Sequence, residues 1–387
     1  MCERDRHAPR LLVLATDYSR PDGYVNRMYV HVRNLYYARQ GYAVTVLNFS
    51  AKADYALDGI PVITLKSYRR QAADAYQLLI CHAPNLRNHY RFLKRYRRYF
   101  ANIVFFFHGH EILRVKQTYP RPYAFRKRAL LKRAWIQPAY DAFKLALWKR
   151  YFLQLAPRAQ FVFVSQFLCD RFFTSMGLPR EALASRTRII PNAIGEAFQR
   201  AQYDEASPKA YDFLTIRSAM DEATYAVDRV TAWARCTPQA RFLLVGRGHF
   251  FEHTERPANL TWLDATLSHA DIISRVNESA CALMPTRHDT QGVMACEMAS
   301  MGMPCITSDI PICHEILGGF ENVAYVQNDA QDVDLCAVYQ RLKAGAPYPR
   351  VSTYDAAHTM RREVALFAAL GYPADAMGTR ERCEGGR

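Results

Sequence analysis

The sequence predicts an α/β protein in which two doubly wound domains face each other across a cleft. With 387 residues, the chain is too long for one ordinary hydrophobic core, so two domains of roughly 200 residues are expected. Short apolar runs alternate with amphipathic patterns along most of the chain, as in parallel sheets covered by helices. Apolar residues make up 50% of the chain, which is ample for two cores and excludes a disordered protein.

The first domain is expected over residues 1–194 and contains five apolar runs that predict buried parallel strands. These runs are Leu11–Ala15, Val44–Asn48, Leu78–His82, Ile103–Phe107 and Gln160–Val164. Amphipathic patterns between them predict helices, for example over Tyr24–Gln40 and Arg87–Phe100. A polar and weakly patterned stretch then suits a linker over residues 195–211.

The second domain is expected over residues 212–352 and repeats the same alternation. Its strands are predicted at Phe213–Arg217, Phe242–Val245, Leu260–Leu263, Ala282–Met284, Cys305–Thr307 and Val323–Val326. A last helix over residues 353–371 is expected to pack back towards the first domain. The Gly- and Arg-rich tail, 372–387, is expected to be frayed.

The positive charge of the chain is concentrated in one segment. The net charge is +15, and residues 84–158 alone carry 18 Lys and Arg against 2 acids, a balance of +16. Aromatic residues are interleaved with these cations at helical spacing, which favours an anionic membrane surface as partner. The alternative is a solvated charged face over an aromatic core. Nucleic acid is disfavoured because no helix-turn-helix, RRM signature or zinc finger is recognisable.

Several features that the sequence lacks limit the expected cellular location of the protein. The charged N-terminus does not resemble a secretory signal, and no apolar run has the length of a membrane span. The 10 cysteines form no C-x-x-C pair or zinc-spaced cluster, so a reducing compartment is expected. We therefore expect a cytoplasmic protein that lies peripherally on the inner face of the plasma membrane.

The segment 285–309 carries the strongest chemical signal. It places Asp289 and Glu297 eight positions apart, across a turn containing Gly292 that leads from a strand into a helix. Ligands bind beyond the carboxyl ends of strands in open α/β sheets, and the first amides of a helix attract phosphate. A phosphorylated sugar nucleotide fits these features. The alternative is structural, with Asp289 capping a helix and Glu297 on its solvated face.

These residues resemble the E-x7-E signature of retaining glycosyltransferases of the GT-B fold, family 4 (glycosyl transferases group 1), of the type that assembles bacterial polysaccharides. The signature stands here as Asp289-Thr-Gln-Gly-Val-Met-Ala-Cys-Glu297. Three further segments are similar to family segments in the same order: Ile189-Ile-Pro-Asn-Ala-Ile194, Phe213-Leu-Thr-Ile-Arg217 and Leu243-Leu-Val-Gly-Arg-Gly248. The resemblance implies two Rossmann-like domains, and it is strongest over residues 160–330.

The resemblance also implies a role for each matching residue. Asp289, Arg217 and His108 would be the catalytic groups. The residues expected to hold the donor are Glu297, Thr290, Gln291, Gly292, Val293, Gly246, Arg247, Asn192 and Gly23. No metal and no other cofactor is expected, because Arg217 and helix amides would stabilise the departing diphosphate.

Two residues depart from the family pattern. Asp289 stands where the family has Glu, and its side chain is one methylene shorter. The Lys that usually follows the Arg is missing from residues 219–227, where Thr224 lies near its expected place. His108 is expected either in the cleft or as an ordinary loop histidine, and His110 with Glu111 offers only two ligands for a metal site.

The function expected from these features is transfer of a hexose from a nucleotide diphosphate sugar to an acceptor hydroxyl, with retention. The acceptor would be a glycan or lipid-linked oligosaccharide that meets the basic face at the membrane. One alternative is a GT-B transferase with a protein or small-molecule acceptor. Another is a non-catalytic GT-B-like subunit that binds a membrane or a partner.

Overall fold

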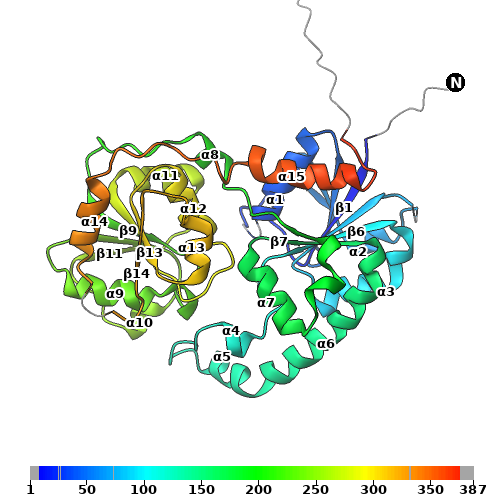
Figure 1. Cartoon of the computed structure of the whole chain (residues 1–387), viewed down its shortest axis with the longest axis horizontal. Helices are drawn as coiled ribbons and strands as arrows, with labels where there is room; N and C mark the ends of the chain where they lie inside the picture. The colour runs from blue at the N-terminus through cyan, green and yellow to red at the C-terminus, as the bar shows by residue number, and fades with distance from the viewer. Residues whose placement is uncertain (1–7, 25, 27, 73, 331–332, 375–387) are drawn as a thin grey trace, which may run out of the picture.

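Two parallel sheets, each covered by helices, form two domains that lie side by side (Figure 1). The computed structural model describes residues 8–24, 26, 28–72, 74–330 and 333–374. Every predicted strand appears within three residues of its expected bounds. The expected tail therefore lies outside the described residues from 375 onwards, as do the first seven residues.

The first sheet has eight strands in the order β3-β4-β2-β1-β5-β6-β7-β8. The strands are β1 Arg10–Ala15, β2 Ala43–Asn48, β3 Tyr55–Leu57, β4 Ile60–Ile63, β5 Leu78–His82, β6 Asn102–Phe107, β7 Ala159–Phe163 and β8 Thr187–Ile189. All neighbours pair in parallel except β3 with β4. The central strands are buried on both faces because helices cover both sides.

The helices of the first domain are α1 Met28–Arg39, α2 Leu65–Tyr68, α3 Arg91–Tyr96, α4 Val115–Thr118, α5 Lys127–Leu131, α6 Gln137–Leu155 and α7 Gln166–Met176. The single helix expected over Arg87–Phe100 is instead broken into three parts. A π-helical turn, Leu86–Tyr90, precedes α3, and a 3₁₀ turn, Arg97–Tyr99, follows it.

The second sheet has six parallel strands in the order β11-β10-β9-β12-β13-β14. They are β9 Tyr211–Ile216, β10 Phe242–Val245, β11 Leu260–Leu263, β12 Ser279–Met284, β13 Cys305–Ser308 and β14 Val323–Val326. The helices around it are α9 Val227–Cys236, α10 Phe250–His253, α11 His269–Asn277, α12 Val293–Ser300, α13 Pro311–Leu317 and α14 Leu335–Lys343.

The chain passes between the two domains twice. The segment expected as a linker contains a short helix, α8 Glu196–Arg200, and the chain returns through α15 Ala356–Ala369. Figure 1 shows α15 lying beside α1 on the first domain. There the buried guanidinium of Arg33 donates to the Glu363 carboxylate at 2.9 Å, and Phe367 packs against Tyr37.

Candidate active site

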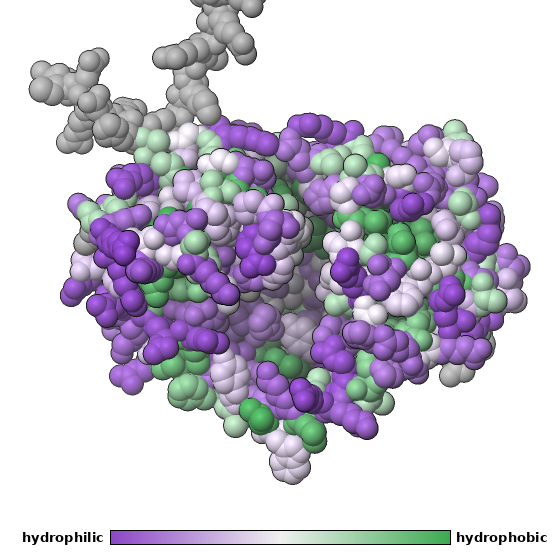
Figure 2. All heavy atoms as spheres, turned by 180° about the vertical axis from the view of Figure 1, so that it is seen from behind, coloured by the Kyte–Doolittle hydropathy of each residue, from purple (hydrophilic) through white to green (hydrophobic). Residues whose placement is uncertain are grey.

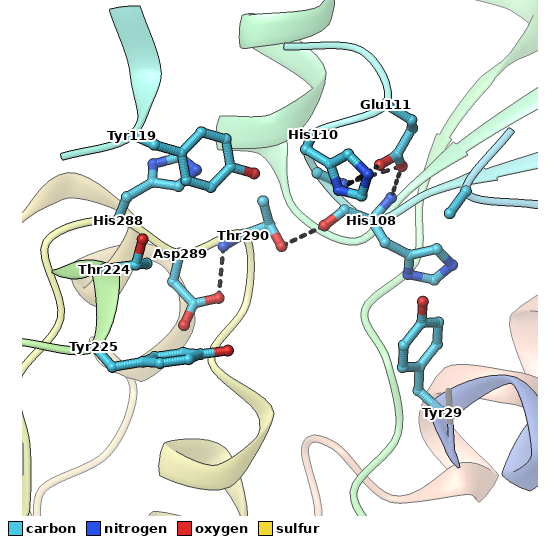
Figure 3. Close-up of a pocket in the computed structure, with 12 residues that line it drawn as sticks. Tyr29, His108, His110, Glu111, Tyr119, Thr224, Tyr225, His288, Asp289 and Thr290 are labelled. Atoms are coloured by element: carbon cyan, nitrogen blue, oxygen red, sulfur yellow. Dashed lines mark hydrogen bonds and ion pairs between the residues drawn. The ribbon is translucent and has the colours of Figure 1, made fainter. Parts of the chain in front are cut away.

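A cavity of about 280 Å³ lies between the two domains, at the carboxyl ends of their strands. The first domain contributes residues that follow β5 and β6, and the second contributes the loop that follows β12. Figure 2 shows the hollow between the two halves of the molecule. The lining residues are Tyr29, Ala83, His108, Gly109, His110, Glu111, Tyr119, Thr224, Tyr225, His288, Asp289 and Thr290 (Figure 3).

Asp289 organises the loop that enters α12. Its Oδ1 accepts hydrogen bonds from the amides of Thr290 at 2.7 Å, Gln291 at 3.1 Å and Gly292 at 2.8 Å. Gly292 adopts φ +68°, in the left-handed region that favours glycine, and α12 begins with Val293. The carboxylate thus caps the loop and also lines the cavity.

Arg217 lies directly behind Asp289. The two residues and Gly292 line a second, very small void, and the Arg217 side chain is buried. Its Nη2 donates to the Pro285 carbonyl at 2.6 Å, while its buried Nε has no acceptor among the described residues. Burial lowers the pKa of Arg217, and the nearby Asp289 opposes that change. One donor of this buried guanidinium is therefore unpaired.

His108 connects the two domains. Its carbonyl accepts a hydrogen bond from Thr290 Oγ1 at 2.7 Å, and its ring lies 4.4 Å from the Tyr29 ring, centroid to centroid. The His108 Nε2 is 3.1 Å from Nδ1 of the buried His82. Glu111 fixes this loop, because its Oε1 accepts hydrogen bonds from the amides of His108 and Gly109.

Glu297 lies apart from the cavity and is buried rather than solvated. Its Oε1 accepts a hydrogen bond from the Gly195 amide at 3.0 Å, at the start of α8. Burial raises the pKa of Glu297 to about 7. The carboxyl therefore lies beside the interdomain crossing, 5% exposed, and the alternative of a solvated helix residue is wrong.

Gln291 and Asn192 are engaged with each other. The Asn192 amide donates to Gln291 Oε1 at 2.6 Å, and Gln291 Nε2 donates to the Asn192 carbonyl at 2.8 Å. Asn192 Oδ1 also accepts from Arg33 Nη1 at 2.8 Å. This pair of hydrogen bonds fixes the loop after β12 to the end of the first domain.

The remaining predicted residues lie outside the lining of the cavity, as far as the described residues go. Gly246 follows β10, where a Cβ would come within 2.1 Å of the Arg217 carbonyl oxygen, so the backbones approach closely. Arg247 beside it is exposed. Gly23 lies in an exposed turn closed by its amide hydrogen bond to the Arg20 carbonyl.

Six cavity residues were not predicted from the sequence: Tyr29, Ala83, Gly109, Tyr119, Tyr225 and His288. Figure 3 shows the Tyr225 ring beneath Asp289, and Tyr119 beside His288. The His288 Nε2 is buried and has no hydrogen-bond partner among the described residues. Only the position of His288 next to Asp289 was a signal in the sequence.

Two cations near the missing Lys have carboxylate partners, and the buried Nε of Arg229 has no acceptor among the described residues. Arg229 pairs with Asp329 at 3.7 Å. Arg287 forms two hydrogen bonds with the Asp228 carboxylate, at 2.7 and 2.6 Å. Within the described ranges, no three His, Cys, Asp or Glu side chains gather closely enough to hold a metal ion. Arg217 is the arginine that lines the same small void as Asp289.

Part of the chain matches the model of a known protein family. Residues 215–338 match the model of the family described as glycosyl transferases group 1. The matched range contains Arg217, Asp289 and Glu297. No curated protein matches the chain by sequence.

Solved structures extend the likeness to nearly the whole chain. Sucrose-phosphate synthase from Thermosynechococcus elongatus is 13% identical over 94% of this chain and 99% of its own, with a TM-score of 0.68. The Anabaena protein HepE, solved with UDP and glucose, is 14% identical over 93% and 100%, with a TM-score of 0.62. The trehalose-6-phosphate protein from E. coli, bound with UDP-2-fluoro glucose, is 13% identical over 94% and 95%, with a TM-score of 0.54. The predicted GT-B fold is confirmed.

Proposed function

We propose that this protein is a hexosyltransferase that moves a sugar from a nucleotide diphosphate donor to an acceptor hydroxyl, with retention at the anomeric carbon. The observation that carries the proposal is the buried Arg217, which has an unpaired Nε and shares a small void with Asp289, a residue that also lines the interdomain cavity. The family match over residues 215–338 covers this half of the site. HepE and the E. coli structure hold UDP, glucose or a UDP-sugar in the same fold.

Each side chain then has a chemical task. The Arg217 guanidinium and the first amides of α12 stabilise the negative charge that develops on the departing diphosphate. His108 and Thr290 position the sugar between the domains through their mutual hydrogen bond. Asp289 orients the sugar hydroxyls through Oδ2, because Oδ1 is occupied by the loop amides. Glu297 accepts hydrogen bonds from the ribose hydroxyls of the donor, which take the place of the Gly195 amide. No step requires a metal.

The test is donor turnover by wild-type protein and by Arg217→Ala, after a thermal-shift panel of nucleotide diphosphate sugars has identified the donor. We expect Arg217→Ala to lower kcat by about 100- to 1000-fold, as for other lost transition-state donors. Arg217→Lys keeps the charge without Nε and should recover only part of the rate. Arg188→Ala is the matched control, because this exposed side chain donates to the nearby carbonyls of Ser185 and Thr187 and to no other described residue. Full turnover by Arg217→Ala would contradict the proposal.

The second candidate is a GT-B-like subunit without activity. Two observations favour it: the Asp289 carboxylate already accepts three loop amides, and Thr224 replaces the usual Lys. That candidate requires that no nucleotide diphosphate sugar raises the melting temperature. A donor-specific rise that disappears in Arg217→Ala decides for the transferase.

The proposed acceptor is a glycan or lipid-linked oligosaccharide presented at a membrane. We base this part on a ridge over α5 and α6, whose members are Leu131, Trp135, Ile136, Tyr140 and Phe143, 44% to 80% exposed. Figure 2 shows apolar side chains among hydrophilic ones along the lower margin, where α5 and α6 run in Figure 1. Cations adjoin the ridge at Lys127, Arg128 and Lys132. Across the described residues, no helix is apolar and long enough to cross a bilayer. The ridge suits contact with an anionic bilayer surface on the cytoplasmic side.

A further inference from the structure

We propose that a second pocket, on the first domain, binds a phosphoryl group of the acceptor. The pocket has a volume of about 420 Å³. It is lined by Phe49, Leu65, Arg69, Arg87, Asn88, Arg91, Phe92, Arg95 and Tyr96. We call it the arginine pocket. The assignment to the acceptor rests on the proposed function, whereas the binding of phosphoryl groups does not.

The charge of the arginine pocket is uncompensated. Four guanidinium groups line it, and its described lining contains no Asp or Glu. None of Arg69, Arg87, Arg91 and Arg95 forms an ion pair or a side-chain hydrogen bond with another described residue. All four side chains are exposed, and Arg91 and Arg95, four residues apart in α3, repel each other weakly. An anion that accepts from several guanidinium groups removes the repulsion.

The local backbone brings the arginines together. Arg87 lies in the π-helical turn Leu86–Tyr90, and Arg91 and Arg95 follow in α3. π-Helical turns occur frequently at functional sites. This turn shifts Arg87 relative to the α-helical register, and Arg69 reaches the same pocket from the end of α2.

The position of the pocket connects it to the cavity between the domains. Phe49 and Leu65 follow β2 and β4, whose parallel pairing places their ends on the edge of the sheet where His108 follows β6. Ala83 lines the main cavity and Arg87 lines the arginine pocket. Four residues of chain span at most about 14 Å between Cα atoms. A ligand of disaccharide size or longer can therefore occupy both places.

The lining also limits the class of ligand. Phe49, Phe92 and Tyr96 give the pocket an aromatic floor, and the Arg95 guanidinium lies 5.6 Å from the Tyr96 ring. Guanidinium forks recognise phosphoryl oxygens, and aromatic faces accept sugar rings or hydrocarbon. The pocket therefore fits a phosphomonoester or diphosphate attached to a sugar or to a lipid. In both cases the group that the arginines bind is a phosphoryl group.

Calorimetric titration with inorganic pyrophosphate, without metal, tests the pocket itself. The variant Arg87→Gln/Arg91→Gln/Arg95→Gln removes three cations from the lining. The matched control, Arg70→Gln/Lys94→Gln/Arg98→Gln, removes three cations of the same region that are equally exposed but lie outside the lining. We expect the pocket variant to bind at least about tenfold more weakly, and the control variant within about twofold of wild type. Equal binding by the two triple variants would overturn the proposal.

A substitution at the donor side distinguishes binding in the arginine pocket from binding at the proposed donor site. Arg217→Ala removes the donor-side cation, so pyrophosphate binding that persists in Arg217→Ala and disappears with the pocket arginines belongs to the arginine pocket. Loss of binding in Arg217→Ala alone would place the anion at the donor side and overturn the inference, while leaving the transferase intact.

Two further arms identify the source of the phosphoryl group. One titrates glucose 6-phosphate, and the other measures flotation with phosphatidylcholine vesicles that contain or lack phosphatidylglycerol. Selective loss of glucose 6-phosphate binding in the pocket variant assigns a soluble sugar phosphate. Selective loss of flotation with phosphatidylglycerol assigns a lipid headgroup. If neither ligand distinguishes the pocket variant from its control, the assignment of the pocket to a sugar phosphate or a lipid headgroup is overturned.

Discussion

The Glu297 carboxyl is buried inside the second domain with one amide donor, so its ionisation is opposed by desolvation. Its pKa rises to about 7 in the folded protein, against an ordinary value near 4.3 for an unfolded chain. The folded state therefore holds this proton more tightly. The stability that the group contributes is complete below the unfolded pKa and is lost as pH rises through the folded pKa.

We expect Glu297→Gln to remove this pH dependence. The Gln carbonyl can still accept the Gly195 amide, but it carries no charge at any pH. The free energy of unfolding of wild type should fall relative to the variant by roughly 3 kcal/mol between about pH 4.5 and pH 8. Urea denaturation across this range measures the difference, with the exposed Glu321→Gln as control. A constant difference between wild type and Glu297→Gln would show that the buried carboxyl titrates normally.

At the scale of elements, the helical stretch that runs from α5 through a π-helical turn, Lys132–Ile136, into α6 is the feature that separates membrane contact from an aromatic core. The sequence interleaves cations and aromatics over this region without showing which of them pack. The structure divides them: Trp148 and Phe152 are buried in the core of the first domain, while Trp135 and Phe143 are 80% and 62% exposed. Both alternatives left by the sequence therefore describe part of the segment.

The exposed part gives a prediction about binding to vesicles. Trp135→Ala/Phe143→Ala removes aromatic side chains that would enter the bilayer interface, while the net charge stays the same. We expect flotation with phosphatidylglycerol vesicles to fall at least about tenfold in partition coefficient. Tyr24→Ala, which removes an exposed aromatic ring elsewhere on the first domain, should float like wild type. Unchanged flotation of the double variant would leave only the charges to account for binding.

At the scale of the molecule, periodic patterns within single elements were predictable and pairings between distant elements were not. The buried strands were found because both faces of each strand are apolar. The short strands β3 and β4 escaped notice, although Asp58-Gly59 between them is a hairpin signal. The Glu297–Gly195 contact spans 102 residues, and no local pattern contains such a contact. The same reason explains why the cavity aromatics were missed, since each comes from a different element.

One such distant pairing closes the cleft on the side of α4 and α5. The arm 119–126 of the first domain reaches the second, where Tyr123 donates to Asp228 Oδ1 at 2.7 Å. Phe125 stacks on His253 at 4.4 Å between ring centroids, and Tyr123 and Phe125 both pack near Phe250. In Figure 1 this arm projects below the gap between the domains. Because the Asp228 carboxylate also holds Arg287, the arm is tied to the loop that carries Asp289.

We expect Tyr123→Ala/Phe125→Ala to shift the domains towards an open state. The variant loses one hydrogen bond to a charged group, of order 1.5–3 kcal/mol, and the apolar contact with Phe250. The population of the open state should therefore rise at least about tenfold. Hydrogen exchange read by mass spectrometry should be faster at residues 108–113 and 286–292, and the KM for the donor should rise because closure completes the site. Arg126→Gln, which breaks only the exposed Arg126–Glu222 pair, should change both readouts little. Unchanged exchange in the double variant would mean that the Thr290–His108 and Gln291–Asn192 contacts hold the domains closed without the arm.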